Sequence, residues 1–143
     1  MNMQPQIYLF FKGNCEAAMR FYAELFGGEV AGIFLNGDAA PDARMPGGDD
    51  MVMNMAITVG GATMMGSDNS DEMYDRPQGF YVNLPASSAE EAQRWFDALK
   101  EDGEVAMPLD ETFWAERFGM VRDRFGTPWM VNYEGAKGEG QPV

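Results

Sequence analysis

Hydrophobic and polar positions follow a helical spacing in the stretch NCEAAMRFYAELFGGEV, residues 14–30. Its apolar residues recur at intervals of 3, 4 and 7, which places them on one face of a helix. Asn14 is a candidate N-cap because its side chain can accept a bond from a free N–H of the first turn. Gly27 and Gly28 are expected to end the helix. The apolar face consists of Ala18, Phe21, Tyr22 and Leu25.

The same spacing returns in SAEEAQRWFDALKEDGEV, residues 88–105. Ser88 and Glu91 form the S-x-x-E pattern of a capping box, and Gly103 ends the apolar periodicity. The apolar residues of this second face lie 74 positions after their counterparts in the first, and the matching offset predicts a duplicated unit. They are Ala92, Trp95, Phe96 and Leu99.

Short apolar or alternating runs surround both helices and predict strands. QIYLFFKG and GFYVNLPA precede the two helices; EVAGIFL, MVMNMAITV and ATMMGS follow the first, and EVAMPL, ERFGMVRD and PWMVNYE follow the second. Gly60–Gly61 and RFGT are expected as turns. Each half is then β-α-β-β-β, and one half leaves its sheet poorly covered. We therefore expect one α+β domain over 1–143, with module one at 5–68 and module two at 78–134. The Gly-rich residues 135–143 are expected to fray.

Composition narrows the possible partners. The chain has 143 residues, 45% of them hydrophobic, and a net charge of −13 from 23 acidic and 10 basic residues. This balance argues against nucleic acid and favours either simple solubility or a cationic ligand. No apolar run approaches the roughly 20 residues that span a membrane, and the N-terminus does not resemble a signal peptide. The single cysteine fits a reducing cytoplasm.

Three segments carry a family resemblance: YLFFKGNCEAAMRFYAELFGGEV, MAITVGGATMMGSD and FWAERFGMVRDRFGTPWMVNYE. Together they make the chain similar to the PhnB-like branch of the vicinal oxygen chelate superfamily, which includes glyoxalase I, bleomycin-resistance proteins and extradiol dioxygenases. The resemblance implies curved mixed sheets around a cleft, helices packed outside, and a homodimer. Some relatives carry a methyltransferase label, but the sequence has no glycine-rich strand-turn-helix that would hold a methyl donor.

The resemblance also predicts where a metal would bind. Members that use a metal place His, Gln or Glu ligands on the first and last strands of each module. Counting along the motifs puts these positions on Ile7, near Phe80, and on Met65 and Met130, all apolar, and the chain has no histidine. We therefore expect no metal or other cofactor of the family's kind. A hard cation held by carboxylates stays open.

Strand alternation, together with the ligand positions that the resemblance implies, predicts a binding surface. Met130, Asn132 and Glu134 share one face of the last strand, and Asn54 shares a face with Ala56 and Thr58 on the third. Many PhnB-like chains have a histidine where Asn54 stands, and an amide cannot act as a general base near neutral pH. The predicted ligand-binding residues mix apolar groups with a few polar ones, as small-molecule pockets do. They are Asn54, Met65, Phe80, Trp114, Met130, Asn132 and Glu134.

Each of these residues also has a possible structural role that involves no ligand. The methionines can simply fill the core, Trp114 can belong to a dimer contact, and Glu134 can be a solvated strand end. Cys15 falls in the first turn of a helix, where the dipole can lower the pKa of a thiol, but a plain small helix residue is the simpler interpretation. The loop 36–50 is either a cover over the cleft or a solvated connection.

The leading functional hypothesis is metal-independent binding of a small, partly apolar molecule in the cleft, with the acidic balance favouring a cationic one. No catalytic residue is assigned. One alternative is a metal-dependent lyase, isomerase or dioxygenase of the glyoxalase type. The other is a protein-interaction scaffold whose cleft is filled by its own side chains.

Overall fold

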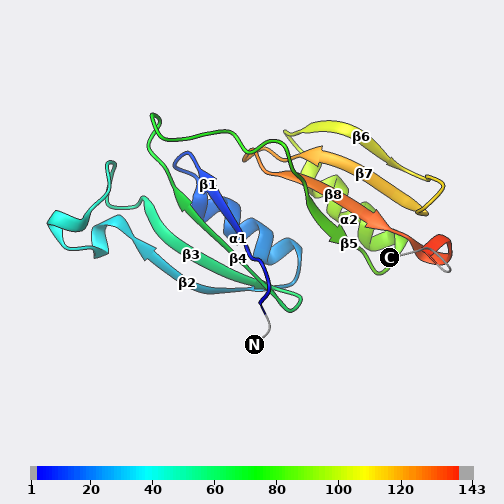
Figure 1. Ribbon diagram of the computed structural model, residues 1–143, viewed down its shortest axis with the longest axis horizontal. Coiled ribbons are helices and arrows are strands. Elements are labelled where there is room, and N and C mark those ends of the chain that lie inside the picture. The colour runs from blue at the N-terminus through cyan, green and yellow to red at the C-terminus, as the bar shows by residue number, and fades with distance from the viewer. Residues whose placement is uncertain (1–2, 139–143) are drawn as a thin grey trace. The chain divides into compact units, whose positions relative to one another are not determined.

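The computed structural model describes residues 3–138, and the chain divides into two compact units at Arg76 and Pro77. The first unit contains five elements (Figure 1). In chain order they are β1 (Ile7–Phe11), α1 (Cys15–Leu25), β2 (Glu29–Leu35), β3 (Val52–Val59) and β4 (Ala62–Asp68). Its strands form one sheet in the order β1-β4-β3-β2, with β1 and β4 parallel and the other pairs antiparallel.

The second unit repeats this topology. Its elements are β5 (Val82–Pro85), α2 (Ala89–Lys100), β6 (Glu104–Asp110), β7 (Arg117–Arg122) and β8 (Pro128–Tyr133). The sheet order is β5-β8-β7-β6, again with one parallel pair, between β5 and β8. The predicted α+β fold of two tandem β-α-β-β-β modules is therefore confirmed. Gly60–Gly61 and residues 123–127 are the predicted turns.

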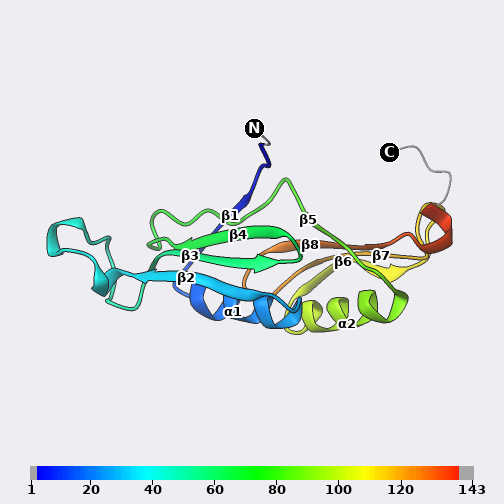
Figure 2. The same ribbon diagram turned by 90° about the horizontal axis from the view of Figure 1, so that it is seen from below.

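Each helix packs against one face of its own sheet and leaves the other face without a helix (Figure 2). The predicted apolar face of α2 is buried throughout. In α1 the buried face is rotated from the prediction, because Phe21 and Leu25 are only half-buried while Met19 and Ala23 are buried. On the sheets, Trp129 and Val131 of β8 and Met55 and Ile57 of β3 face the helices and are fully buried. The expected alternation of these two strands is thus correct.

The two helices begin in different ways. Ser88 caps α2 as predicted: its Oγ accepts the Glu91 N–H at 3.1 Å, while the Glu91 carboxylate accepts the Ser87 N–H at 2.9 Å. The predicted cap by Asn14 on α1 is wrong, since that side chain makes no capping hydrogen bond.

The carboxylate of Asp68, at the end of β4, takes over this role. Its Oδ1 accepts the N–H groups of Gly13 at 3.0 Å and Cys15 at 2.9 Å, and its Oδ2 accepts that of Val52 at 2.9 Å. Asp68 is 2% exposed. The two oxygens of the Asp68 carboxylate accept all three N–H groups. The single amide oxygen of Asn14 could accept only from the start of the helix.

Cys15 lies in the interior beside this carboxylate. Burial, together with the charges of Asp68 and Glu16, raises the pKa of its thiol well above the usual range. The helix dipole therefore does not make this thiol reactive, and the simpler interpretation of Cys15 as a small core residue fits the structure.

The loop 36–50 is organised around one buried amide. Asn36 is 1% exposed; its Nδ2 donates to the carbonyls of Met45 at 3.0 Å and Gly48 at 3.1 Å, and its Oδ1 accepts the Met45 N–H at 2.9 Å. Two short 3-10 turns, η1 (Asn36–Asp38) and η2 (Pro41–Ala43), lie within it. The amide thus gives the loop the backbone partners that a strand would otherwise supply.

The expectation of a fraying tail from residue 135 does not hold for its first part. Residues Gly135–Gly138 form a 3-10 turn, η3, with hydrogen bonds to residues 112 and 116. Residues 139–143 lie outside the described part of the chain. Within that part, no helix has the length and apolar character required to cross a bilayer.

Asp68→Asn is expected to lower the free energy of unfolding by about 2–4 kcal/mol, because an amide replaces one acceptor oxygen with a donor that faces buried N–H groups. Urea unfolding followed by circular dichroism measures this loss. Asp71→Asn, an exposed change three residues away, is the matched control and should stay within about 0.5 kcal/mol of the parent. Equal stability of the two variants would contradict the anchoring role of Asp68.

Candidate functional site

The helix-free face of the first sheet is mostly apolar. We call it the first open face, and its central residues are Tyr8, Phe10, Phe34, Asn54, Ala56 and Met65. The strand pairs Tyr8 with Met65, Met65 with Ala56, and Asn54 with Phe34 place these side chains on one side, because directly paired residues point the same way. Phe10 and Phe34 are each 46% exposed.

One hydrogen bond and one ring contact order the first open face. The Asn54 Nδ2 donates to the Tyr8 hydroxyl at 3.3 Å, and the Tyr8 and Phe10 rings lie 5.1 Å apart in a tilted pair. Gly32 pairs with Ala56, and a Cβ added to Gly32 would meet no atom within 4 Å. The face therefore combines exposed aromatic rings with open space above small residues.

The structure places Asn54 and Met65 on this face as predicted. The prediction that Ile7 lies on the same face is wrong. Ile7 pairs with Met64 on the helix side, in line with the buried Leu9 and Phe11, so its neighbour Tyr8 occupies the position expected for it. Gly13, with a φ of 89°, makes a turn between β1 and α1 that counting back from the helix does not register.

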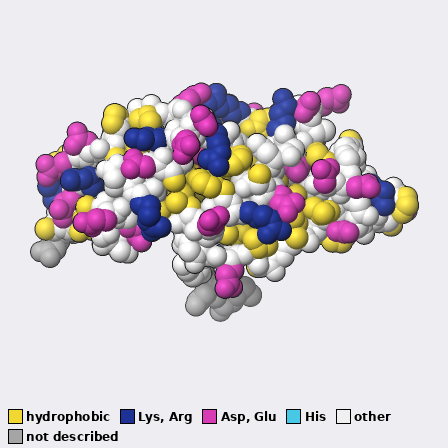
Figure 3. Space-filling view, turned by 180° about the vertical axis from the view of Figure 1, so that it is seen from behind, with side chains coloured by type: hydrophobic (Ala, Val, Ile, Leu, Met, Phe, Trp, Pro, Cys, Tyr) yellow, Lys and Arg dark blue, Asp and Glu magenta, His cyan; other side chains and the backbone are white. Residues whose placement is uncertain are grey.

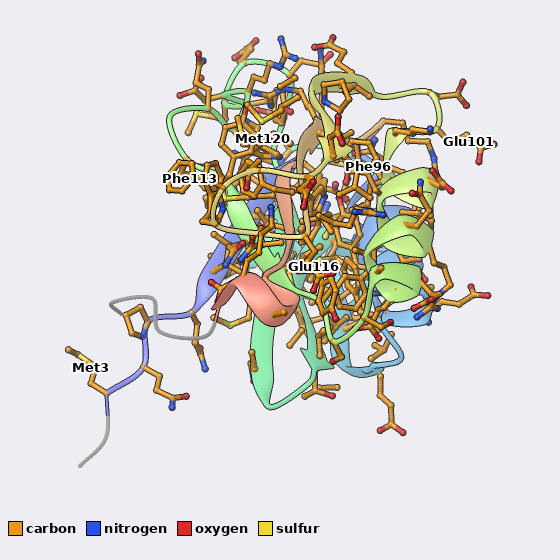
Figure 4. The ribbon with its side chains drawn as sticks, turned by 90° about the vertical axis from the view of Figure 1, so that its right-hand side faces the viewer. Met3, Phe96, Glu101, Phe113, Glu116 and Met120 are labelled. Carbon is orange, nitrogen blue, oxygen red and sulfur yellow. The ribbon has the colours of Figure 1, made fainter. Side chains whose placement is uncertain are left out.

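The helix-free face of the second sheet we call the second open face. Its central residues are Asn83, Phe118, Met120, Met130 and Asn132. Cross-strand pairing places Met130 between Asn83 and Met120, and Asn132 opposite Phe118. In Figure 4, Met120 lies on the side of the sheet opposite Phe96 of α2. The prediction that Met130 and Asn132 share the face away from the helix is correct.

Trp114 covers part of the second open face. Its ring packs edge-on against Phe118 at 5.0 Å, and Phe113 packs on Trp114 in turn at 4.9 Å. Phe113 is 83% exposed and lies on the same side as Met120 (Figure 4). The aromatic pair thus extends the surface beyond the start of β7, next to Phe118, which pairs with Asn132.

Asn132 carries an unusual polar atom. Its Oδ1 is buried yet has no hydrogen-bond partner within residues 3–138. Its neighbours across the sheet, Phe118 and Pro85, offer no side-chain donor. A buried acceptor without a partner costs about 1–3 kcal/mol, so such groups are rare in folded proteins.

Two predicted residues leave the site. Phe80 precedes β5 and is 40% exposed. The residues of β5 that pair with the start of β8 are Val82, opposite Trp129, and Asn83, opposite Met130. Glu134 follows the last residue of β8, is exposed, and its carboxylate packs against Gly138 of η3. The alternation that put Glu134 beside Asn132 stops one residue earlier, at Tyr133.

The donor set of the open faces does not fit a catalytic metal of the kind that metal-using relatives hold. The paired positions on the first and last strands of each module are Tyr8 with Met65 and Asn83 with Met130. None supplies imidazole or carboxylate, the donors that zinc, nickel and ferrous sites require. No group of three or more Cys, Asp or Glu side chains suited to a metal occurs in the described residues.

A separate hollow of about 410 Å³ lies in the first unit. It is formed by the turn after β1, the end of the loop 36–50 and the segment after β4, with one lysine and two acidic side chains at its rim. None of the predicted site residues lines it. Its lining residues are Lys12, Gly13, Pro46, Gly47, Met51, Asn69, Ser70, Asp71 and Glu72.

The excess negative charge does not form one continuous patch on the face seen in Figure 3. Acidic and basic side chains alternate there, with hydrophobic side chains between them. The net charge of −13 therefore acts on this face as a diffuse field, which attracts cations without fixing where they bind.

The sequence matches the family model of the Glyoxalase/Bleomycin resistance protein/Dioxygenase superfamily over residues 6–131. The chain belongs to this superfamily. It is 34% identical to protein YjdN of Escherichia coli over 134 residues, 87% of the chain and 91% of YjdN. The solved structure of protein PA1353 from Pseudomonas aeruginosa is 41% identical and superposes with a TM-score of 0.84, covering 93% of the chain and 98% of PA1353.

A PhnB protein from Bacillus cereus, described as a putative 3-demethylubiquinone-9 3-methyltransferase, is 27% identical with a TM-score of 0.72. That match covers 92% of the chain and 99% of the Bacillus protein. Together these likenesses place this superfamily member in the PhnB-like branch, as the motifs predicted.

Several residues of the open faces were not predicted. Tyr8, Phe10 and Phe34 lie in runs that are apolar at almost every position, so alternation carries no information about their faces. Phe118 and Met120 were available to sequence reasoning. In RFGMVR, glycine and valine alternate with larger side chains, and the same alternation rule applied to β8 would have found both.

Asn132→Leu is expected to raise the free energy of unfolding by about 1–2 kcal/mol, because it removes a buried acceptor without a partner and keeps a similar volume. Thermal and urea unfolding measure the change. The control is Asn83→Leu, which alters an exposed amide on the same face and should be neutral within about 0.5 kcal/mol. A loss of stability on Asn132→Leu would show that its amide already has its partners.

Proposed function

We propose that this protein binds a small, partly apolar molecule that carries a hydrogen-bond donor, and that it does so on the second open face without a metal. The observation that carries this proposal is the buried Asn132 Oδ1 with no partner in the described chain. A ligand N–H or O–H would satisfy that atom. The thioethers of Met120 and Met130 would meet the apolar part of the ligand.

The energetics favour a donor of positive charge. A hydrogen bond from a charged donor to a shielded acceptor contributes about 1.5–3 kcal/mol, roughly twice a neutral one. Glu134 is exposed and its carboxylate lies against Gly138 of η3, so we assign no counter-charge to it, and the net charge of −13 would act by long-range attraction. Trp114 and Phe118 add ring faces that attract cations. A primary ammonium on an apolar skeleton meets all these conditions.

The first open face belongs to the same proposal as a second surface of similar character. Asn54 and Met65 remain proposed ligand-binding residues there, beside Tyr8 and Phe34. Asn54 already donates to the Tyr8 hydroxyl, so its amide is less in need of a ligand than that of Asn132. We therefore assign the stronger polar contact to the second sheet.

No observation favours the lyase, isomerase, dioxygenase or scaffold alternatives. The methyltransferase description of the Bacillus protein is not transferred either, because helix α1 begins on the carboxylate of Asp68. A helix start that binds a nucleotide-like cofactor is glycine-rich and leaves its N–H groups free.

Four benzyl compounds test the proposal by separating charge from hydrogen bonding. Benzylammonium has both, benzyltrimethylammonium has charge without a donor, benzyl alcohol has a donor without charge, and toluene has neither. We expect benzylammonium to bind most tightly by isothermal titration calorimetry, about ten-fold over benzyltrimethylammonium, since the two differ by one hydrogen bond. Excess EDTA should leave the affinity unchanged.

Asn132→Leu should remove the advantage of benzylammonium over benzyltrimethylammonium, while Glu134→Gln, on an exposed carboxylate beyond β8, should preserve it. The proposal is wrong if toluene binds as well as benzylammonium, if Asn132→Leu leaves the ratio intact, or if binding disappears with EDTA and returns with Mn²⁺. The last outcome would favour the enzyme alternative.

We further propose the homodimer that the resemblance implies. The edge strand β6 supports it: Val105 is 45% exposed and Met107 is 41% exposed, so both sides of this strand offer apolar surface to a second copy. Sedimentation equilibrium should give twice the mass of one chain, and Met107→Lys should shift it toward one. Met73→Lys, at a loop position that is 71% exposed in the first unit, should have no effect.

A further inference from the structure

The segment that carries Trp114, residues Glu111–Glu116, is tied at both ends to the turn η3. We call this segment the Trp114 loop. At its start, the Lys137 Nζ contacts the Glu111 carboxylate at 2.6 Å and donates to the Thr112 carbonyl at 2.8 Å. At its end, the Glu116 carboxylate accepts the N–H of Ala136 at 2.8 Å. The Glu116 N–H also donates to the Glu134 carbonyl at 3.3 Å.

Contacts inside the Trp114 loop make it one unit. The Thr112 N–H donates to the Ala115 carbonyl at 3.0 Å, and the Ala115 N–H donates to the Thr112 Oγ1 at 3.1 Å. Ala115 is fully buried and holds the middle of the loop to the core. The ring of Trp114 then lies on Phe118, the residue paired with Asn132. Displacing the ends of the loop would therefore move the rings of Phe113 and Trp114, which lie over the second open face.

We propose that η3 is a latch that holds the Trp114 loop over the second open face, with Lys137 as a positioning residue for the ligand site. The consequence for the ligand rests on the proposed function, whereas the latch itself can be tested without any ligand. Lys137 suits this role because one ammonium group reaches two acceptors at the start of the loop.

Gly135 makes the other half of the latch possible. Its φ is 58°, in the left-handed region that glycine adopts freely, and a Cβ there would collide with the Glu116 carboxylate. The Glu116 side chain therefore reaches the Ala136 N–H only because residue 135 has no side chain. Figure 4 shows Glu116 beside η3.

The electrostatics of Glu111 agree with this geometry. The hydrogen bond and the positive charge of Lys137 lower the pKa of the Glu111 carboxyl. Glu111 is exposed and Lys137 is half-buried, and a single surface pair of this kind is weak. The latch depends on several such contacts acting at the two ends of one short segment, and it can therefore open without unfolding the sheet.

Tryptophan fluorescence gives a direct test. The chain has three tryptophans; Trp95 and Trp129 are buried, so quenching by acrylamide reports mainly on Trp114. Lys137→Met keeps the side-chain stem but removes the charge and donors, and should raise the Stern–Volmer constant roughly two-fold. Gly135→Ala should raise it by a separate route, at the opposite end of the loop.

The controls match the change in chemistry. Lys100→Met removes a lysine that contacts Asp97 at 3.3 Å on the surface of α2, and should leave quenching unchanged. Lys137→Arg keeps charge and donors and should restore the parent value. Trp114→Phe gives the background from the two buried tryptophans. Circular dichroism melts confirm that each variant is folded before it is compared.

The outcomes separate the latch from the proposed function. Increased quenching together with benzylammonium binding that is about two- to five-fold weaker supports both. Increased quenching in a protein whose parent form binds no benzyl compound supports the latch and overturns the proposed function. Unchanged quenching in both Lys137→Met and Gly135→Ala overturns the latch, whatever happens to binding.

Discussion

The buried carboxylate of Asp68 is the interaction on which the first unit depends. Donors from the turn after β1, from the first turn of α1 and from the start of β3 all converge on it. An anion in the interior is tolerated only with such complete hydrogen bonding, so the three segments are held in one arrangement. That arrangement keeps α1 on one side of the sheet and leaves Tyr8, Asn54 and Met65 uncovered on the other.

The second unit has the same topology but fixes the start of its helix and its last turn with different residues. There Ser88 caps the helix, and the buried Asp123 accepts the N–H groups of Phe125 and Thr127 and the indole N–H of Trp129.

The fold could be predicted because the two halves repeat one pattern, and local rules were sufficient for the second helix, the glycine turns and the faces of β3 and β8. The site could be predicted only where a strand alternates clearly. In β8, Met130 and Asn132 alternate with Trp129 and Val131, so the two share one face, and the family resemblance indicated that this face is the open one. In β1, by contrast, the sequence IYLFF is apolar throughout, so only the burial of Leu9 and Phe11 shows that Tyr8 rather than Ile7 is exposed on the open face. Asp68 escaped prediction because its donors are 16 to 55 positions away in the chain, and no local pattern records such distances.

The second open face differs from a well-packed interior in ways that suit binding. The Asn132 Oδ1 has no partner in the described chain, and the methionine side chains beside it adapt to different shapes. The two ends of the Trp114 loop are attached by polar contacts to η3. Each feature makes this face less stable or less rigid than leucine side chains and more extensive core packing would. Such departures concentrate where a protein acts, because selection for stability alone would remove them. Among the described residues, the first unit has no buried side-chain acceptor without a partner, and this contrast makes the second open face the better place to look for activity.

The position of Cys15 has a practical consequence. It is the chain's single cysteine, and its thiol resists ionisation first because it is fully buried and then because the carboxylate of Asp68 lies beside it. Alkylating reagents need both access and a thiolate, and the folded first unit offers neither. Alkylation of Cys15 therefore proceeds only through transient opening around α1. The alkylation rate measures how often that opening occurs in the native protein, under conditions where spectroscopic signals do not change. A cysteine introduced at a surface position would react alone, so fluorophores or spin labels can be attached at chosen sites without first removing the natural thiol.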